Sequence, residues 1–141
     1  MSTMKPVTVR LKSRQDGEQV IQELPGEATI RGSQLYVRYE EPNSGPEGGA
    51  TRTTVKIGEQ ELKIIRHGEV QSEQSFELGR RLPGFYRSPY TSFALSTHTT
   101  KLEVHRDGLN GKVEWTYDLY AFEQLSGHFA ISLHIQEETK S

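Results

Sequence analysis

Residues 7–24, VTVRLKSRQDGEQVIQEL, form two runs in which apolar and polar residues tend to alternate, separated by an Asp-Gly pair at 16–17. Alternation with a period of two places the apolar side chains on one face of a β-strand. The Asp-Gly pair suits a two-residue turn, because both of its central residues need a positive φ. Pairing the residues that flank this turn places Val9 opposite Leu24. The segment therefore predicts a β-hairpin with one apolar face.

The same pattern continues toward the C-terminus. Pro25-Gly26 marks a bulge in the second strand, since proline lacks a ladder donor and glycine tolerates a bend. Gly32-Ser33 forms the next turn and places Ile30 opposite Leu35. No stretch of ten or more residues has the spacing of an amphipathic helix, so the chain is predicted to be all-β. Further alternating runs cover residues 51–57, 62–66, 69–78 and 82–87.

Short turns, together with strands that are apolar on one face only, favour a closed sheet. A meander of about 8–10 strands has one apolar face to bury and two edges to cover, and closure solves both problems. We therefore predict an antiparallel up-and-down closed barrel, with a two-sheet sandwich as the alternative. The whole chain, residues 1–141, fits a single domain. Residues 42–50, PNSGPEGGA, are predicted to be a flexible loop.

Charge pairing suggests a register for the C-terminal third. One hairpin is predicted within residues 93–106, a second around Gly108–Gly111 and a third turning near Gln124. The second register brings opposite charges together across strands, as at His105 and Glu114. The predicted pairs are Phe93 with Arg106, Val104 with Trp115, and Leu119 with Phe129.

Composition excludes several classes of protein. The absence of cysteine removes disulfides, thiolate metal sites and cysteine nucleophiles. The net charge of −2 argues against a partner held mainly by overall charge, such as non-specific DNA or an anionic membrane. The N-terminal residues lack the apolar core of a signal peptide, and no window is long and apolar enough for a membrane span. A cytoplasmic location, without a membrane partner, is therefore expected.

The segment GFYRSPY at residues 84–90, followed by FALST at 93–97, resembles the YwiB-type family of uncharacterised bacterial proteins. The opening PVTVRL and the late YDLY at residues 117–120 are similar to strings at the same places in that family. Thr91 stands where the family pattern has glycine. The resemblance covers nearly the whole chain and implies a calycin-like barrel, the architecture of lipocalins and fatty-acid-binding proteins. It implies no activity, because the family is a domain of unknown function.

Polar residues on the apolar face are the candidates for a ligand site, because a buried polar group needs a partner. Arg106 is the most informative, since a guanidinium facing the lumen needs a carboxylate, carbonyl groups, water or an anionic ligand. Alternatively, it lies at a strand end and reaches solvent along its own stem. A cavity of about 300 Å³ or more beside Arg106 favours a small, partly apolar ligand, whereas a filled lumen favours an interaction module. The candidate ligand-binding residues are Tyr39, Ser72, Gln74, Tyr86, Arg106, Trp115 and Tyr117.

Two surface functions are weighed as alternatives. Basic and aromatic residues interleave from Arg80 to Tyr90, as on surfaces that bind single-stranded nucleic acid weakly. Tyr120 and Phe122 are predicted to adjoin on the outer face, where they would support a homodimer.

No catalytic motif appears in the chain. There is no G-x-S-x-G, and the five histidines include no pair at the i, i+2 or i, i+4 spacing of a metal site. We therefore expect a non-enzymatic protein without a metal or cofactor.

Overall fold

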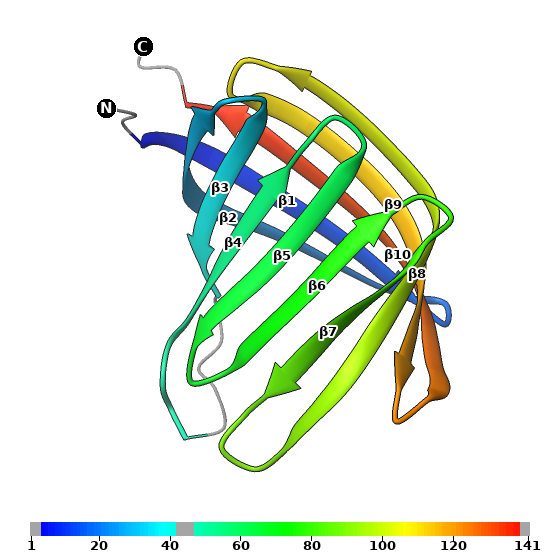
Figure 1. The fold of residues 1–141 in the computed structure, drawn as a ribbon. Helices are drawn as coiled ribbons and strands as arrows, with labels where there is room; N and C mark the ends of the chain where they lie inside the picture. Colours follow the sequence, from blue (N-terminus) through cyan, green and yellow to red (C-terminus); the bar gives the residue numbers. More distant parts are fainter. Residues whose placement is uncertain (1–3, 42–46, 139–141) are drawn as a thin grey trace.

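The computed structural model describes residues 4–41 and 47–138, in which ten antiparallel strands form a closed barrel (Figure 1). Closure is made by β1, which pairs with β2 on one side and with β10 on the other. In these described segments, no helix has the length and apolar character needed to cross a membrane. The strands are β1 (Lys5–Gln15), β2 (Glu18–Arg31), β3 (Gln34–Glu40), β4 (Thr51–Ile57), β5 (Glu61–Gly68), β6 (Gln71–Glu77), β7 (Arg81–Arg87), β8 (Ser92–Asp107), β9 (Asn110–Ala121) and β10 (Gln124–Glu137).

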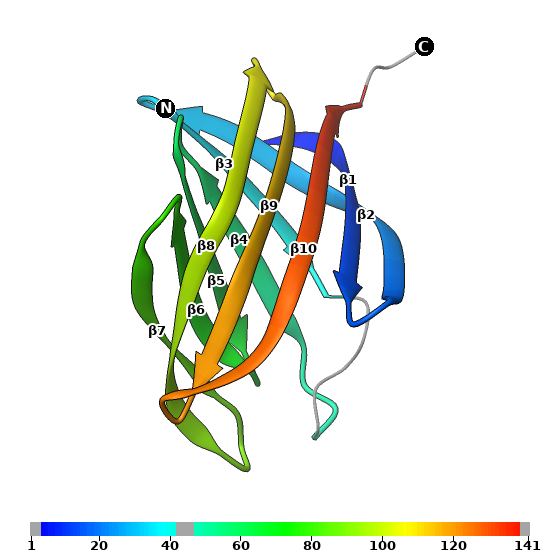
Figure 2. The ribbon, with the colours of Figure 1, turned by 90° about the vertical axis from the view of Figure 1, so that its right-hand side faces the viewer.

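Each strand is joined to the next around the barrel, so the connections alternate between its two ends. The β2–β3, β4–β5, β6–β7 and β8–β9 turns lie at one end, here called the upper end (Figure 2). The remaining turns lie at the lower end. The loop predicted at 42–50 falls partly outside the described residues; its described part, 47–50, lies between β3 and β4.

The N-terminal register is confirmed. Val9 pairs with Leu24, and Ile30 pairs with Leu35. Asp16 and Gly17 form the turn with φ values of 49° and 85°, which is the positive-φ pair that this type of hairpin requires.

The hairpin predicted within residues 93–106 is wrong, because β8 runs without interruption through this whole segment. Its register shifts between Thr99 and Lys101, where one extra residue is inserted. Phe93 therefore pairs with Tyr86 of β7 rather than with Arg106. A bulge switches the inward face from odd to even positions, and a hairpin turn would produce the same change in the sequence pattern.

The two later hairpins are displaced by two residues from their predicted register. Val104 pairs with Val113 instead of Trp115, and Phe129 pairs with Tyr117 instead of Leu119. Both turns are tighter than predicted, because Asp107 pairs with Asn110 and Ala121 pairs with Gln124. A shift of two residues keeps every side chain on its predicted face, but it removes the predicted charge pairs. His105, for example, lies opposite Lys112 and not Glu114.

Phe122 is also corrected by this register. It is not on the outer face of a strand with Tyr120 but forms the β9–β10 turn together with Glu123, both with positive φ. Its ring packs against Phe93, with 5.1 Å between the ring centroids. Tyr120 and Phe122 therefore do not form the pair of adjoining aromatic residues on the outer face that was predicted to support a homodimer.

The core fills much of the barrel interior with large side chains. Trp115 and Phe76 are the largest of them, at 2% and 1% exposure. Phe76 contacts both Trp115 and Tyr117, at centroid distances of 5.7 and 4.8 Å. Buried valine, leucine and isoleucine from β1, β3, β4, β5, β9 and β10 also belong to this cluster. Burial of this apolar surface, at about 25 cal/mol per Å², is the main favourable contribution to folding.

β8 contacts β6 directly beyond the end of the short β6–β7 ladder. β7 pairs with β6 only from Gln71 to Glu73, and above this point Thr97 of β8 donates a 2.6 Å hydrogen bond directly to the carbonyl of Ser75. β7 also approaches β6 closely where their ladder ends: a Cβ atom on Gly84 of β7 would lie 2.1 Å from the carbonyl oxygen of Glu73 of β6.

We expect Gly84→Ala to destabilise the barrel by about 1–3 kcal/mol, because the added methyl group must displace a strand backbone. Gly111→Ala is the matched control, since its nearest neighbour would be a Leu35 side-chain atom at 3.4 Å. Urea unfolding of both variants measures the difference. Equal stabilities for the two variants would contradict the close approach of β6 and β7.

Candidate functional site

Arg106 crosses the upper end of the barrel. It lies on the inward face of β8, close to the β8–β9 turn. Its Nη1 donates to the carbonyl of Ser33 in the β2–β3 turn at 2.7 Å and to that of Ile57 at the end of β4 at 3.3 Å. Of the partners predicted for this guanidinium, the structure provides carbonyl groups. Arg106 thus connects β8 with the end of β4 and with the β2–β3 turn across the barrel mouth.

A hollow of about 430 Å³ opens beside this guanidinium. Ile30 and Val104 supply apolar walls, while Ser33, Glu59 and Arg106 supply polar groups. Ser33 and Glu59 also line a neighbouring hollow of about 630 Å³, into which Leu102 extends the apolar surface. Both volumes are in the range of small-molecule sites.

Arg106 has hydrogen-bonding capacity left over. Its Nε is buried and has no hydrogen-bond partner. In residues 4–41 and 47–138, its guanidinium forms no ion pair with a carboxylate. A guanidinium has five N–H donors, and a buried donor without a partner costs about 1–3 kcal/mol. The arrangement can accept a small molecule that carries an oxygen acceptor or a single negative charge.

The other predicted polar residues lie on a different part of the inner wall. Tyr39, Ser72 and Tyr86 belong to a row of inward-facing residues that pair from strand to strand across β3 to β7. Gln74 lies two residues from Ser72 on the same face of β6. The complete row, called here the inner polar row, is Tyr39, Thr53, Arg66, Ser72 and Tyr86.

Two polar groups of this row share one partner, Glu41, which follows β3. Arg66 forms a two-pronged ion pair with Glu41, at 2.6 Å from Nε to Oε1 and 2.8 Å from Nη2 to Oε2. Thr53 donates to the same Oε1 at 3.1 Å. Burial raises the pKa of Tyr39, while its hydrogen bond with Thr53 opposes that shift. Arg66 therefore has the carboxylate partner that Arg106 lacks among the described residues.

Trp115 and Tyr117 belong to the packed core. Trp115 is 2% exposed, and its Nε1 has no hydrogen-bond partner. Tyr117 stacks on Phe129 with 5.2 Å between the ring centroids. The predicted candidates therefore occupy three separate places: the upper mouth, the inner polar row and the core.

Sequence reasoning missed the residues that accompany the predicted ones. Arg66 follows Leu62 and Ile64 at two-residue intervals on β5, so it lies on the same strand face. The alternation alone therefore indicated an inward guanidinium. Glu41 lies after β3, where no alternation marks it. Ser33 and Glu59, which line the hollow, are in turns and carry no periodic signal.

The segment from Arg80 to Tyr90 presents few free groups. Arg81 lies over the ring of Tyr120 at 4.0 Å and donates from Nε to Ser96 at 2.8 Å. Arg80 pairs with Glu77 at 3.2 Å. Tyr90 is 71% exposed, whereas Tyr86 faces inward and stacks on Phe93. Nucleic-acid binding through this segment stays a prediction.

Comparisons with known proteins agree on a single relationship. Residues 6–133 match the family model described as a domain of unknown function, DUF1934. The chain is 26% identical over 128 residues to the "Uncharacterized beta-barrel protein YwiB" of Bacillus subtilis (strain 168), and the match covers 88% of each chain. A crystal structure of the ywiB protein from Bacillus subtilis superposes with a TM-score of 0.80 at 23% identity, covering 98% of this chain and 96% of that one. The resemblance inferred from the sequence motifs is thereby confirmed.

Burial raises the pKa of Tyr117 from 10.0 to about 12. Because the folded state holds this proton more tightly, its contribution to stability is complete below pH 10 and declines as the pH rises toward 12. We expect wild-type protein to lose about 2–3 kcal/mol through this residue, and Tyr117→Phe to lack that loss. Urea unfolding at several alkaline pH values tests this. Tyr90→Phe, at an exposed site, serves as the control and should follow the wild type.

Proposed function

The chain belongs to the DUF1934 family, and we propose that it acts by binding rather than by catalysis, holding a small, partly apolar ligand at the upper end of the barrel. The proposal includes a cytoplasmic site of action and needs no metal or cofactor.

One observation carries this proposal: the Arg106 guanidinium keeps donors beyond its two carbonyl bonds, and it lies beside a hollow with both apolar and polar walls. Arginine in such a position is costly unless something accepts its remaining hydrogen bonds. The two carbonyl bonds hold the side chain in place, so a ligand would not have to order it on binding. Fixed polar groups next to apolar surface are typical of small-molecule sites.

The lining limits the class of ligand. A head group with oxygen acceptors, such as a carboxylate, would meet the Arg106 donors. Ile30, Val104 and Leu102 would contact a short apolar portion. Glu61 and Glu77 line the neighbouring hollow, where Arg80 pairs with Glu77, and Glu59 lies between the two hollows. These carboxylates would repel a second negative charge on the ligand. We therefore propose a molecule with one anionic or carbonyl end and an uncharged body.

The packed core supports a second candidate function. Trp115, Phe76 and their neighbours occupy the interior below the mouth, so a large ligand would not enter the barrel in the manner of a fatty acid. A barrel that is filled in this way can act through its surface as an interaction module. A homodimer remains one form of this alternative, and a monomer in light scattering at high micromolar concentration would argue against it.

Native mass spectrometry of gently purified protein tests the ligand proposal. We expect excess mass that disappears on denaturation, because the bound molecule is held without a covalent bond. Where purification removes the ligand, medium-chain carboxylates should raise the melting temperature. Arg106→Leu should weaken their binding about tenfold or more, through the loss of a charge-assisted hydrogen bond.

Arg87→Leu is the matched control, because it removes an exposed arginine on β7 and should leave binding unchanged. Circular dichroism establishes that both variants fold, and Arg106→Lys separates charge from the geometry of the guanidinium. A wild-type protein with no excess mass and no response to the carboxylates would overturn the proposal and favour the surface function.

A further inference from the structure

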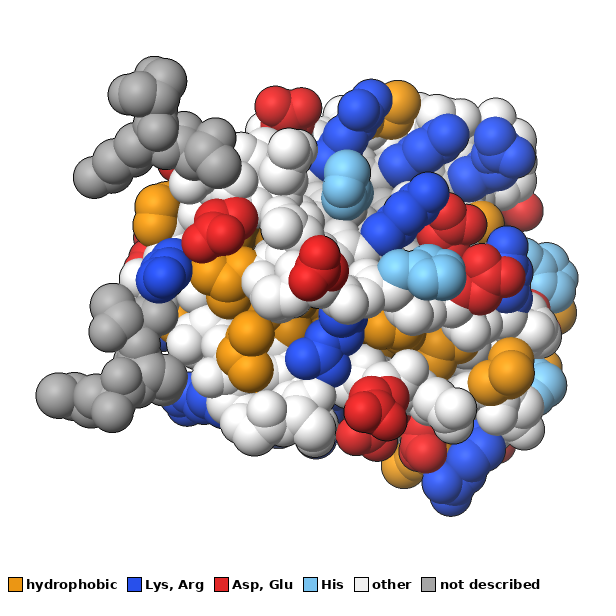
Figure 3. Space-filling view, turned by 90° about the horizontal axis from the view of Figure 1, so that it is seen from above, with side chains coloured by type: hydrophobic (Ala, Val, Ile, Leu, Met, Phe, Trp, Pro, Cys, Tyr) orange, Lys and Arg blue, Asp and Glu red, His pale blue; other side chains and the backbone are white. Residues whose placement is uncertain are grey.

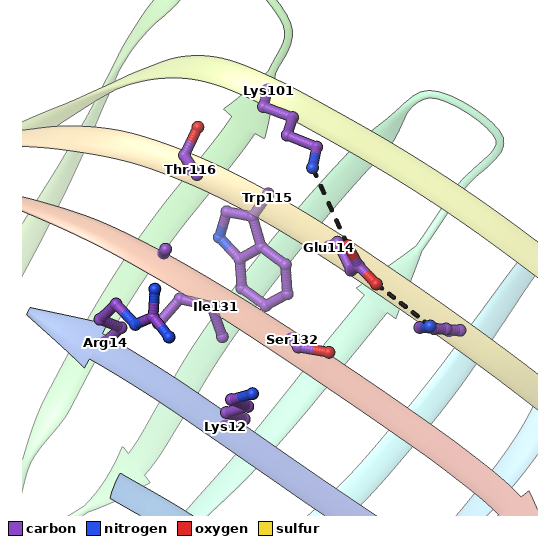
Figure 4. A pocket seen from close by; sticks show the side chains of 10 residues that line it. Lys12, Arg14, Lys101, Glu114, Trp115, Thr116, Ile131 and Ser132 are labelled. Atoms are coloured by element: carbon purple, nitrogen blue, oxygen red, sulfur yellow. Dashed lines mark ion pairs between the residues drawn. The ribbon is translucent and has the colours of Figure 1, made fainter. Parts of the chain in front are cut away.

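A groove of about 390 Å³ lies on the outer face of the barrel, over strands β1, β10, β9 and β8. Its floor is low because small side chains occupy the middle strands: Ala130 and Ser132 on β10, and Thr116 on β9. Trp115 and Ile131 lie beneath this floor and belong to the core side of the sheet (Figure 4). The groove is thus separated from the barrel mouth and from Arg106.

Cationic side chains line the groove on both sides. Lys12 and Arg14 rise from β1 on one side, while Lys101 of β8 and Lys112 of β9 lie on the other (Figure 4). The register sets the arrangement across the sheet: Arg14 pairs with Ala130, Ala130 with Thr116, and Thr116 with Lys101. With about 4.8 Å between strands, the backbones of β1 and β8 are roughly 14 Å apart.

Glu114 is the one carboxylate among the described residues that line the groove, and it is already paired. Its Oε1 lies 3.2 Å from the Nζ of Lys112, and its Oε2 lies 3.9 Å from that of Lys101. Lys12 and Arg14 form no ion pair within residues 4–41 and 47–138. With four cations and one carboxylate, the groove is locally positive, although the net charge of the chain is −2.

A row of alternating cations and imidazole rings runs beside the groove. Arg10 pairs with His134, His134 with Lys112, and Lys112 with His105, one residue on each of four adjacent strands. The upper-end view in Figure 3 shows Lys, Arg and His side chains gathered along one side of the molecule, with a few carboxylates among them. Histidine rings and arginine planes are groups on which unpaired bases stack.

We propose that this groove binds a single-stranded nucleic acid, with the backbone phosphates between the two cationic sides and bases against the Arg10–His105 row. Charge complementarity selects a polyanion, and the positions of Lys12 and Arg14, about 7 Å apart along β1, suit a chain of repeated charges. The imidazole row favours a nucleic acid over an acidic peptide, which has no bases to stack. The roughly 14 Å between the flanking strands suits one strand rather than a duplex.

Binding by this groove should depend strongly on salt. Four phosphate contacts to a single strand give a slope of about 2.8 for the logarithm of Kd against that of the salt concentration. Affinity should therefore fall about 50-fold between 50 and 200 mM salt. The affinity itself should be modest, in the range of about 10⁻⁴ to 10⁻⁶ M that is usual for contacts made mainly to phosphates.

Fluorescence anisotropy with a labelled 12-nucleotide oligouridylate measures both quantities. The double variant Lys12→Gln/Arg14→Gln removes one side of the groove, and it should roughly halve the salt slope to about 1.4. Both residues are exposed, so the fold should be retained. His105→Ala and His134→Ala should weaken binding without changing the slope, because bases rather than phosphates contact these rings.

The matched control is Arg80→Gln/Arg87→Gln, which removes two cations from the 80–90 segment and leaves the groove intact. We expect it to bind like the wild type. Loss of binding in this control but not in the groove variant would assign the site to the 80–90 segment and overturn the proposal. Equal affinity for a labelled oligoglutamate of the same length would also overturn it, since the groove would then be a site for acidic proteins. Neither result bears on the ligand proposed at Arg106.

Discussion

The whole structure depends on β1 pairing with two partners at once. Its ladder with β2 follows directly from the Asp16-Gly17 turn, whereas its ladder with β10 joins the two ends of the chain. The second ladder removes both free edges, which otherwise expose unpaired N–H and C=O groups. Closure also gives every strand an inside and an outside. Val7 and Val9 are fully buried as a result, while Arg10 and Lys12, which follow them on the same strand, remain in solvent.

The fold and the facing of most side chains could be predicted from the sequence, but the C-terminal register could not. Alternation specifies which face a residue occupies, and a two-residue slip leaves that face unchanged. Turn length decides between such registers. Gly108-Leu109 has the glycine-first pattern of a two-residue type II′ turn, but this pattern also fits the four-residue loop predicted around it, and Phe122-Glu123 carries no turn signal. Phe122 and Glu123 accept positive φ in spite of their residue types. Cross-strand charge pairs, at about 0.2–1 kcal/mol each, did not determine the pairing.

The candidate site was predictable only on the strand that carries it. The two-residue alternation on β8 predicted that Arg106 faces inward with Leu102 and Val104, and all three residues line the upper hollows. Its partners Ser33 and Ile57 are 73 and 49 residues away, so only the closed barrel brings them together. The alternation also grouped Tyr39, Ser72 and Tyr86 with Arg106. It shows which face of the sheet a residue occupies, but it does not show how far along the barrel axis the residue lies. In the structure the two groups are separate, and among the described residues Arg66 of the inner polar row has a carboxylate partner whereas Arg106 has none.

A single inserted residue in β8 connects the two proposed sites. Leu95, Thr97 and Thr99 face inward at odd positions, and Leu102 and Val104 face inward at even ones, with the register shift between Thr99 and Lys101. The extra residue, Thr100, is exposed and hydrogen-bonds to Thr116 across the outer face at 2.7 Å. Without this bulge, Arg106 would point to solvent and Lys101 would point into the core. The insertion therefore places a guanidinium at the barrel mouth and an ammonium group beside the outer groove from the same strand, and the two faces can bind independently because the closed sheet lies between them.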